Sequence, residues 1–191
     1  MIASVIHNLR NLTNFSGQDT KNQFWPYAGV LLGLSFLGLM LAWIPEFLAS
    51  FVRAEAFAIA NPEMATIIEE PGSKTIIIHE FHPDLMPNFG WLFGSLGLIC
   101  AILVMMVAAS VARRLRDRGK TWLWAVPPLI FLIIGAVGMQ TLFAAFARDE
   151  AGSEMFGAFM LLFANNAAYL GSLGCLVYLL AGDSKTETPS A

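Results

Sequence analysis

Residues 89–124 read FGWLFGSLGLICAILVMMVAASVARRLRDRGKTWLW. The first 24 positions of this stretch carry no charged residue, and the next eight hold five arginines and lysines. A helix needs about 20 consecutive apolar residues to cross the hydrocarbon core of a bilayer. The stretch therefore predicts a transmembrane helix over residues 89–112, followed by a short basic loop over residues 113–120.

The composition of the whole chain agrees with a membrane protein. Of its 191 residues, 57% are apolar and 13% are charged, whereas soluble domains have about 45–50% apolar and about 25% charged residues. Three more windows are long and apolar enough to cross a bilayer: 25–47, 121–147 and 156–181. The sequence therefore predicts an all-α integral membrane protein, a bundle of four transmembrane helices.

The distribution of basic residues predicts the orientation, because short cytoplasmic loops are enriched in lysine and arginine. The loop over residues 113–120 is strongly basic, whereas residues 48–88 and 148–155 are rich in carboxylates. The basic loop is thus expected in the cytoplasm, and an even number of crossings places both termini there. Segments 1–24 and 182–191 are then cytoplasmic, and segments 48–88 and 148–155 are periplasmic.

The segments outside the predicted helices have patterns of their own. Apolar residues recur at near-helical spacing in residues 1–14, which indicates a short amphipathic helix that lies on the cytoplasmic surface or packs against the bundle. Ser16 or Asp19 is then expected to cap the next helix. The last residues, from Asp183 on, are typical of a disordered tail.

The larger periplasmic segment contains the sequence ATIIEEPGSKTIIIHEF. Its two β-branched runs, 65–70 and 74–81, flank a Pro-Gly pair and predict a small β-hairpin. The residues before it, 48–60, predict an amphipathic helix along the outer surface.

Two roles are possible for the basic loop, and the first is a structural turn between two helices. Asp117 follows Arg113 and Arg114 by four and three residues, so it can pair with both on one helical face, and Gly119 suits the left-handed conformation that ends a helix. The alternative is contact with lipid headgroups or phosphate through five side chains: Arg113, Arg114, Arg116, Arg118 and Lys120. No general base or nucleophile accompanies them, so neither a catalytic site nor an enzyme is predicted.

Two sequence blocks carry a resemblance to a known family. The first runs from Ala112 to Thr121 and is followed by Trp122, Trp124 and Pro127. The second consists of Phe15-Ser16-Gly17, Lys21 and Phe24-Trp25. Together they resemble the domain of unknown function 805 family, the YhaH-like bacterial inner-membrane proteins.

That resemblance implies a small four-helix protein of the bacterial inner membrane. It implies no activity, because the function of the family is not established. The chain departs from the family pattern at Gln18, where the family usually has arginine, and at Arg116, where it usually has histidine. Any role that depends on that histidine is therefore not carried over.

Other polar residues predict little chemistry. His79 and His82 make a weak metal-site candidate without a third defined ligand, so no metal and no cofactor are predicted. Cys100 and Cys175 lie in apolar stretches and give no disulfide pattern. The helix centres carry no charge, which disfavours ion-coupled transport.

Small residues are spaced for close helix packing, either within the chain or with another membrane protein or a second copy. They are Gly29 and Gly33, Gly90 and Gly94, and Gly171 and Gly174. We therefore expect a non-enzymatic scaffold or accessory subunit that binds another membrane protein or lipid, with anionic headgroups at the cytoplasmic face and no nucleic acid as partners. The alternative is a small channel or carrier for a neutral solute along Gln140, Asn165 and Asn166, whose competing role is hydrogen bonding between helices. A lipid-modifying membrane enzyme has no supporting constellation of residues.

Overall fold

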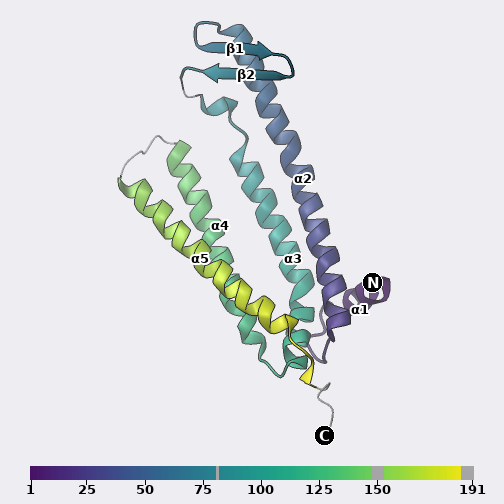
Figure 1. The fold of residues 1–191 in the computed structure, drawn as a ribbon. Helices are drawn as coiled ribbons and strands as arrows, with labels where there is room; N and C mark the ends of the chain where they lie inside the picture. The colour runs from purple at the N-terminus through teal and green to yellow at the C-terminus, as the bar shows by residue number, and fades with distance from the viewer. Residues whose placement is uncertain (81, 148–152, 186–191) are drawn as a thin grey trace. The chain divides into compact units, whose positions relative to one another are not determined.

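The computed structural model describes residues 1–80, 82–147 and 153–185. Within these residues, four helices are long and apolar enough to cross a membrane, and one two-stranded sheet is present. The helical elements are α1 (Ile2–Arg10), α2 (Lys21–Ala60), α3 (Phe89–Asp117), α4 (Val126–Ala147) and α5 (Ser153–Ala181), drawn in Figure 1. The short 3-10 helices η1 (Pro83–Leu85) and η2 (Trp122–Ala125) precede α3 and α4. The prediction of four long apolar helices is confirmed.

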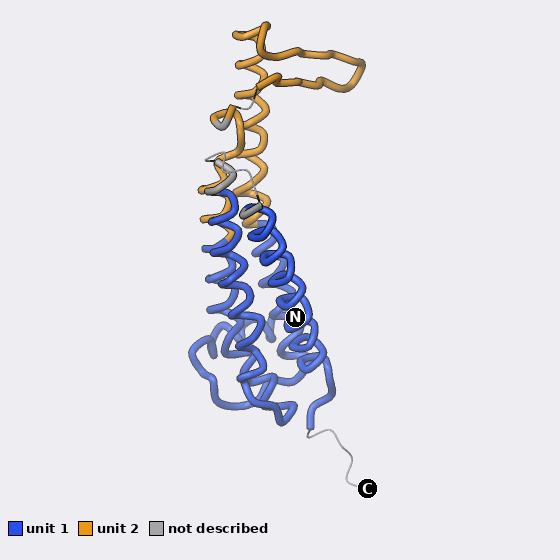
Figure 2. Tube along the Cα trace, turned by 90° about the vertical axis from the view of Figure 1, so that its left-hand side faces the viewer, with its two compact units in different colours: residues 1–37, 97–191 blue, residues 38–96 orange. Residues whose placement is uncertain are grey.

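The chain divides into two compact units, coloured separately in Figure 2. Unit 1 comprises residues 1–37 and 97–191, and unit 2 comprises residues 38–96. Unit 1 has a small buried core in which one end of α2, the end of α3 and the end of α5 meet. Its buried apolar side chains are Phe24, Ala28, Val111, Leu115, Leu176 and Leu180.

Helix α2 is longer than the predicted transmembrane segment. The helix continues past Phe47 to Ala60 and has 40 residues, about twice the number that a bilayer core requires. Residues 48–60 are helical as predicted, but they extend α2 and do not form a separate helix. Pro45 lacks an N–H for the helix ladder, yet the helix continues through it.

The start of α2 also differs from the prediction. Thr20 precedes the helix, and both its backbone N–H and its hydroxyl donate to Gln23 Oε1, at 2.9 and 3.1 Å. A Thr followed three residues later by Gln is a capping-box sequence. Ser16 and Asp19 were therefore the wrong candidates for this cap, and Asp19 has a different role described below.

Unit 2 contains the predicted β-hairpin. Strands β1 (Ala65–Glu70) and β2 (Ser73–Ile78) pair antiparallel, with Glu70 opposite Ser73, so only Pro71 and Gly72 form the loop. Gly72 has a φ of +88°, which glycine adopts without steric cost. The second strand begins one residue earlier than expected and ends at Ile78.

Side chains of α2 hold the rest of unit 2. Lys74 of β2 donates to Glu55 at 2.6 Å and lies 3.1 Å from Glu69, and these hydrogen bonds, Glu55 first, raise the pKa of Lys74. The Trp43 indole N–H donates to Leu92 O and Ser95 Oγ, each at 3.2 Å. The hairpin and the start of α3 are thus both attached to α2 by side-chain contacts.

Helices α4 and α5 pack closely in unit 1. The Asn165 amide donates to Phe131 O at 3.0 Å, and a Cβ at Gly135 would lie 2.9 Å from Asn165 Nδ2. A Cβ at Gly138 would lie 3.0 Å from Leu162 Cδ1. Hydrogen bonding between helices, one of the two interpretations of Asn165, is therefore confirmed, and Asn166 bonds within α5 to Leu162 O at 3.0 Å.

We predict that Gly135→Ala destabilises this helix pair by about 1–3 kcal/mol, the usual cost of overpacking. The added methyl group would have to displace the Asn165 amide from its bond to Phe131. The matched control is Gly171→Ala on α5, where a Cβ meets nothing within 4 Å. Thermal unfolding in detergent should show a lower midpoint for Gly135→Ala only; equal midpoints for both variants would contradict the packing described.

Candidate functional site

The most concentrated polar group in unit 1 lies where α3 ends. We call it the arginine cluster, and it consists of Asp19, Arg113, Arg114, Asp117 and Ser184. Every one of its side chains is buried, and Asp19 and Arg114 have no exposed surface at all. Unpaired charges at such positions would be strongly unfavourable, so their partners determine what the cluster can do.

Helix geometry places these arginines within α3 and not in a loop. The helix continues beyond the predicted boundary at residue 112 and ends at Asp117. Lys120 N–H then donates to Leu115 O and Gly119 N–H to Arg116 O, both at 2.8 Å, which is a Schellman motif. Gly119 has a φ of +67°, so its predicted role in ending the helix is confirmed.

We predict that Gly119→Ala costs about 1–2 kcal/mol, because an L-residue pays roughly this amount to adopt the left-handed conformation. The matched control on the same helix is Gly97→Ala, which has ordinary helical geometry and open space around its Cβ. Chemical denaturation in detergent should shift to lower denaturant for Gly119→Ala alone. A shift of the same size for Gly97→Ala would show that the turn is not responsible.

The arginines divide into two pairs by their helical spacing. Arg113 and Arg116 are three residues apart and contact the segment before α2. Arg114 and Arg118 are four residues apart and contact the end of α5. Residues three and four apart lie on the same side of a helix, so the end of α3 together with Arg118 directly after it contacts two different segments.

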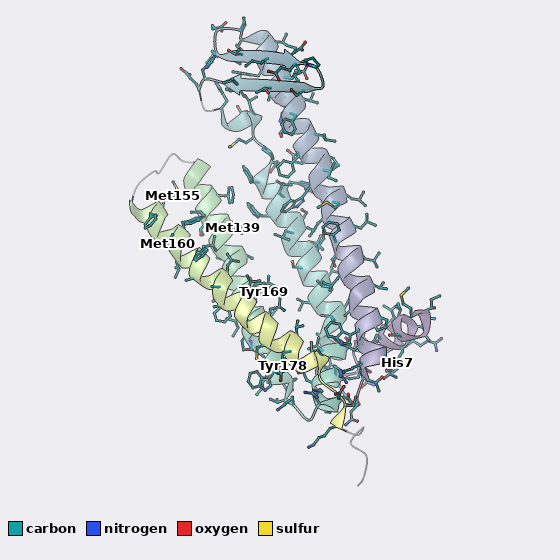
Figure 3. The ribbon with its side chains drawn as sticks, viewed as in Figure 1. His7, Met139, Met155, Met160, Tyr169 and Tyr178 are labelled. Carbon is teal, nitrogen blue, oxygen red and sulfur yellow. The ribbon has the colours of Figure 1, made fainter. Side chains whose placement is uncertain are left out.

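Arg113 ties the N-terminal segment to α3. Its Nε donates to Asp19 Oδ2 at 2.8 Å, its Nη2 to Asn8 Oδ1 at 2.8 Å, and its Nη1 to Asn11 O at 2.7 Å and Asn14 O at 2.5 Å. The other oxygen of Asp19 lies 3.1 Å from His7 Nε2, and Figure 3 marks His7 on α1 beside the start of α2. Asp19 is therefore held between a helix-borne arginine and a histidine.

Arg116 extends this attachment at the surface. Its Nη1 donates to Phe15 O at 2.5 Å and to Gly17 O at 3.2 Å. The two arginines together thus bind four backbone carbonyls of residues 11–17, a segment outside any helix that depends on side chains for its hydrogen bonds.

Arg114 holds the end of α5. Its Nε donates to Leu180 O at 3.0 Å, its Nη2 donates to Gly182 O, and its Nη1 pairs with Asp117. Ser184 completes the arrangement by donating to Asp117 Oδ2 at 2.6 Å. The last carbonyls of a helix lack hydrogen-bond donors within the helix, and here the buried guanidinium of Arg114 donates to them.

Arg118 and Lys21 act on the same end of the chain. Arg118 donates to Leu179 O at 3.2 Å and to Asp183 O. Lys21, the first residue of α2, donates to the Asp183 carboxylate at 2.5 Å, and this hydrogen bond lowers the pKa of Asp183. A carboxyl with a lowered pKa contributes stability above its unfolded pKa, and that contribution is lost as the pH falls.

These contacts correct part of the sequence interpretation. Asp117 pairs with Arg114 as predicted, but Arg113 pairs with Asp19 instead. Arg113 and Arg114 are buried and bonded to protein groups, so the alternative of lipid or phosphate contact gains no support at these two residues. Lys120 has an exposed side chain.

The predicted glycine pairs were given two possible roles, and packing within the chain is one of them. A Cβ at five of the six glycines would meet nothing within 4 Å, and at Gly90 it would meet only the Asn88 side chain, at 3.3 Å. Those five are Gly29, Gly33, Gly94, Gly171 and Gly174. A Cβ at any of them would not touch the described part of its own unit, whereas the α4 glycines Gly135 and Gly138 lie close to α5.

Chemically, the cluster offers hydrogen bonds and ion pairs that are already used. The described residues contain no group of three histidine, cysteine, aspartate or glutamate side chains that could hold a metal ion. The arrangement joins three segments far apart in sequence: residues 7–19, the end of α3 and residues 179–184. Such a site can hold a conformation, and its described side chains are engaged with one another.

Comparisons with known proteins give no further assignment. No protein-family model matches the chain, and neither a curated protein nor a solved structure matches it significantly.

Proposed function

We propose that this chain is a non-enzymatic scaffold or accessory subunit of a bacterial inner membrane, which binds another membrane protein or lipid. The observation that carries the proposal is a contrast between its polar and apolar groups. The buried charges are bonded to protein partners, whereas glycine-lined faces of α2 and α5 are uncovered within unit 1. Small residues allow helix backbones to approach closely in lipid, so they suit contact with a second transmembrane helix.

The proposed topology places both termini and the arginine cluster in the cytoplasm and the hairpin in the periplasm. It is supported by the basic residues around α3 and by the carboxylates of residues 46–88. The two sequence blocks around Phe15 and Arg113 further support membership of the domain of unknown function 805 family. Both blocks fall at the contacts between the N-terminal segment and α3, where a shared sequence pattern has a structural reason.

Enlarging the glycines tests the proposed assembly. Gly29→Leu with Gly33→Leu on α2, and Gly171→Leu with Gly174→Leu on α5, should each preserve the melting temperature because no neighbour is displaced. We expect at least one of these variants to lose the partner, or the dimer, seen by native mass spectrometry after gentle-detergent purification.

The control for this experiment is Leu34→Phe, which enlarges another exposed side chain on α2. This variant should retain the complex. A chain that purifies alone, or a complex that survives both glycine pairs, would contradict binding through these faces. The neutral-solute channel gains no support, because the Asn165 amide is engaged with Phe131 O.

A further inference from the structure

Helix α1 has an unusual arrangement of its two faces. Its polar residues point toward the protein: Ser4 and Asn8 are buried, whereas Ile2 is 74% exposed, Ile6 44% and Leu9 43%. An amphipathic helix on a water-soluble surface normally buries its apolar side. Here the apolar side faces outward and is not covered by the part of the chain that the structure describes, so an apolar neighbour would stabilise it.

Specific hydrogen bonds hold α1 in this orientation. Ser4 Oγ donates to Gln23 O at 2.5 Å and Asn8 Nδ2 donates to the same carbonyl at 2.8 Å. Asn8 Oδ1 accepts from Arg113 at 2.8 Å, and His7 contacts Asp19. Because these bonds are made on the polar side, α1 cannot roll its apolar side inward without losing them.

The position of α1 indicates which neighbour covers its apolar side. Its contacts are to Gln23, in the first turn of α2, and Figure 1 shows α1 beside that end of the helix. The apolar run of α2 starts immediately afterwards, with Trp25 37% exposed, and tryptophan favours the boundary between headgroups and acyl chains. Helix α1 is therefore bonded to the turn of α2 that directly precedes the apolar run of α2.

The charge at the end of unit 1 that carries α1 also favours contact with an anionic lipid surface. The described residues at this end of unit 1 include three carboxylates (Asp19, Asp117 and Asp183) and eight basic side chains: Arg10, Lys21, Arg113, Arg114, Arg116, Arg118, Lys120 and Lys185. Arg10 lies on the outward side of α1 and makes no ion pair with the described residues. Basic side chains at an interface attract anionic lipid headgroups, and a long side chain can reach them while its stem covers apolar surface.

We propose that α1 is an interfacial membrane anchor, with the apolar side of Ile2, Ile6 and Leu9 inserted at the headgroup–acyl boundary of an anionic leaflet. Arg10 and Lys120 contact the headgroups, and the Asn8–Arg113 bond fixes the depth of the helix. The inference does not depend on which protein the chain binds. It moves the lipid contact from Arg113 and Arg114, which are buried, to a helix that the arginine cluster holds in place.

Spin-label accessibility tests the proposal on the whole protein. Labels on Ile6→Cys and, as a control, Thr13→Cys are introduced after Cys100→Ala and Cys175→Ala remove the native thiols. The protein is reconstituted in phosphatidylcholine vesicles containing phosphatidylglycerol. We expect the label at position 6 to be relaxed by oxygen far more than by a water-soluble nickel chelate, and the label at position 13 to show the reverse.

Three outcomes would overturn the proposal. Equal nickel accessibility at positions 6 and 13 would place α1 in water, and protection of position 6 from both reagents would indicate a protein neighbour instead of lipid. For the charge, Arg10→Gln with Lys120→Gln should abolish the difference in label depth between vesicles with and without phosphatidylglycerol, and a difference that persists would exclude these two contacts. Asn8→Ala should broaden the depth distribution at position 6, while Thr13 stays in water.

Discussion

Replacement of Arg114 by methionine should destabilise unit 1 strongly. Among the described residues, the change leaves the buried Asp117 carboxylate with Ser184 as its partner, and it removes the donors to Leu180 O and Gly182 O. Removal of one partner from a buried ion pair costs on the order of 3–5 kcal/mol. Thermal unfolding in detergent should therefore show a large fall of the midpoint.

A double substitution separates the ion pair from the rest of the contacts. Arg114→Met with Asp117→Leu removes both charges, so it should recover part of the lost stability, because buried pairs replaced by apolar residues are often tolerated. Arg114→Lys should remain clearly destabilised, since a lysine cannot reproduce the directed donors of a guanidinium. A single Arg114→Met variant that melts like the native chain would show that the cluster does not hold the end of α5.

The second large effect is expected at Arg113. Arg113→Met removes the arginine partner of the buried Asp19, which keeps only its contact with His7 among the described side chains, and the bonds to Asn8, Asn11 and Asn14. We therefore expect a loss of about 3 kcal/mol or more. The effect should be local, because these bonds all lead to the segment before α2. Hydrogen exchange of residues 2–20 should rise strongly, whereas exchange in α4 and α5 should change little.

Arg116→Met is the matched control for this variant. Arg116 also binds carbonyls of the N-terminal segment, but its contacts are exposed to solvent, and exposed polar contacts contribute about 1 kcal/mol or less. We therefore expect a small rise in exchange limited to residues 15–17. Equal effects of Arg113→Met and Arg116→Met would contradict the difference in burial on which this prediction rests.

The fold was largely predictable because its signals are local. Hydropathy identifies the four long helices, the Pro71-Gly72 pair predicts the hairpin loop, and Gly119 predicts the end of α3. The lengths of the helices were harder to predict from the sequence. A hydropathy window detects only the apolar part of a helix. It therefore does not detect the extensions of α2 to Ala60 and of α3 to Asp117, which contain charged residues.

The arginine cluster was only half predictable. The pair of Arg114 with Asp117 follows from their spacing along one helix. Asp19 and Ser184 lie 94 and 67 residues from their partners Arg113 and Asp117, so only the tertiary structure shows these contacts. The N-terminal segment did contain a usable signal for these contacts. Asn8, Asn11 and Asp19 are polar residues beside an apolar helical pattern, and such residues need hydrogen-bond partners when the segment packs.

The packing glycines show the same limit. Spacing selected Gly29 and Gly33 as contact positions, but the glycines that lie against another long helix are Gly135 and Gly138. These two stand three residues apart in α4, opposite Asn165 and Leu162, and spacing cannot say which helix faces which.

The most direct test of the account is the sidedness of the cluster and the hairpin in the membrane. Single cysteines at Thr13 and Glu70, in a chain lacking Cys100 and Cys175, are exposed to a membrane-impermeant maleimide in right-side-out vesicles. The account predicts labelling of Glu70→Cys in intact vesicles and of Thr13→Cys only after permeabilisation. Labelling of Thr13→Cys from outside, or protection of Glu70→Cys in intact vesicles, would contradict the proposed topology.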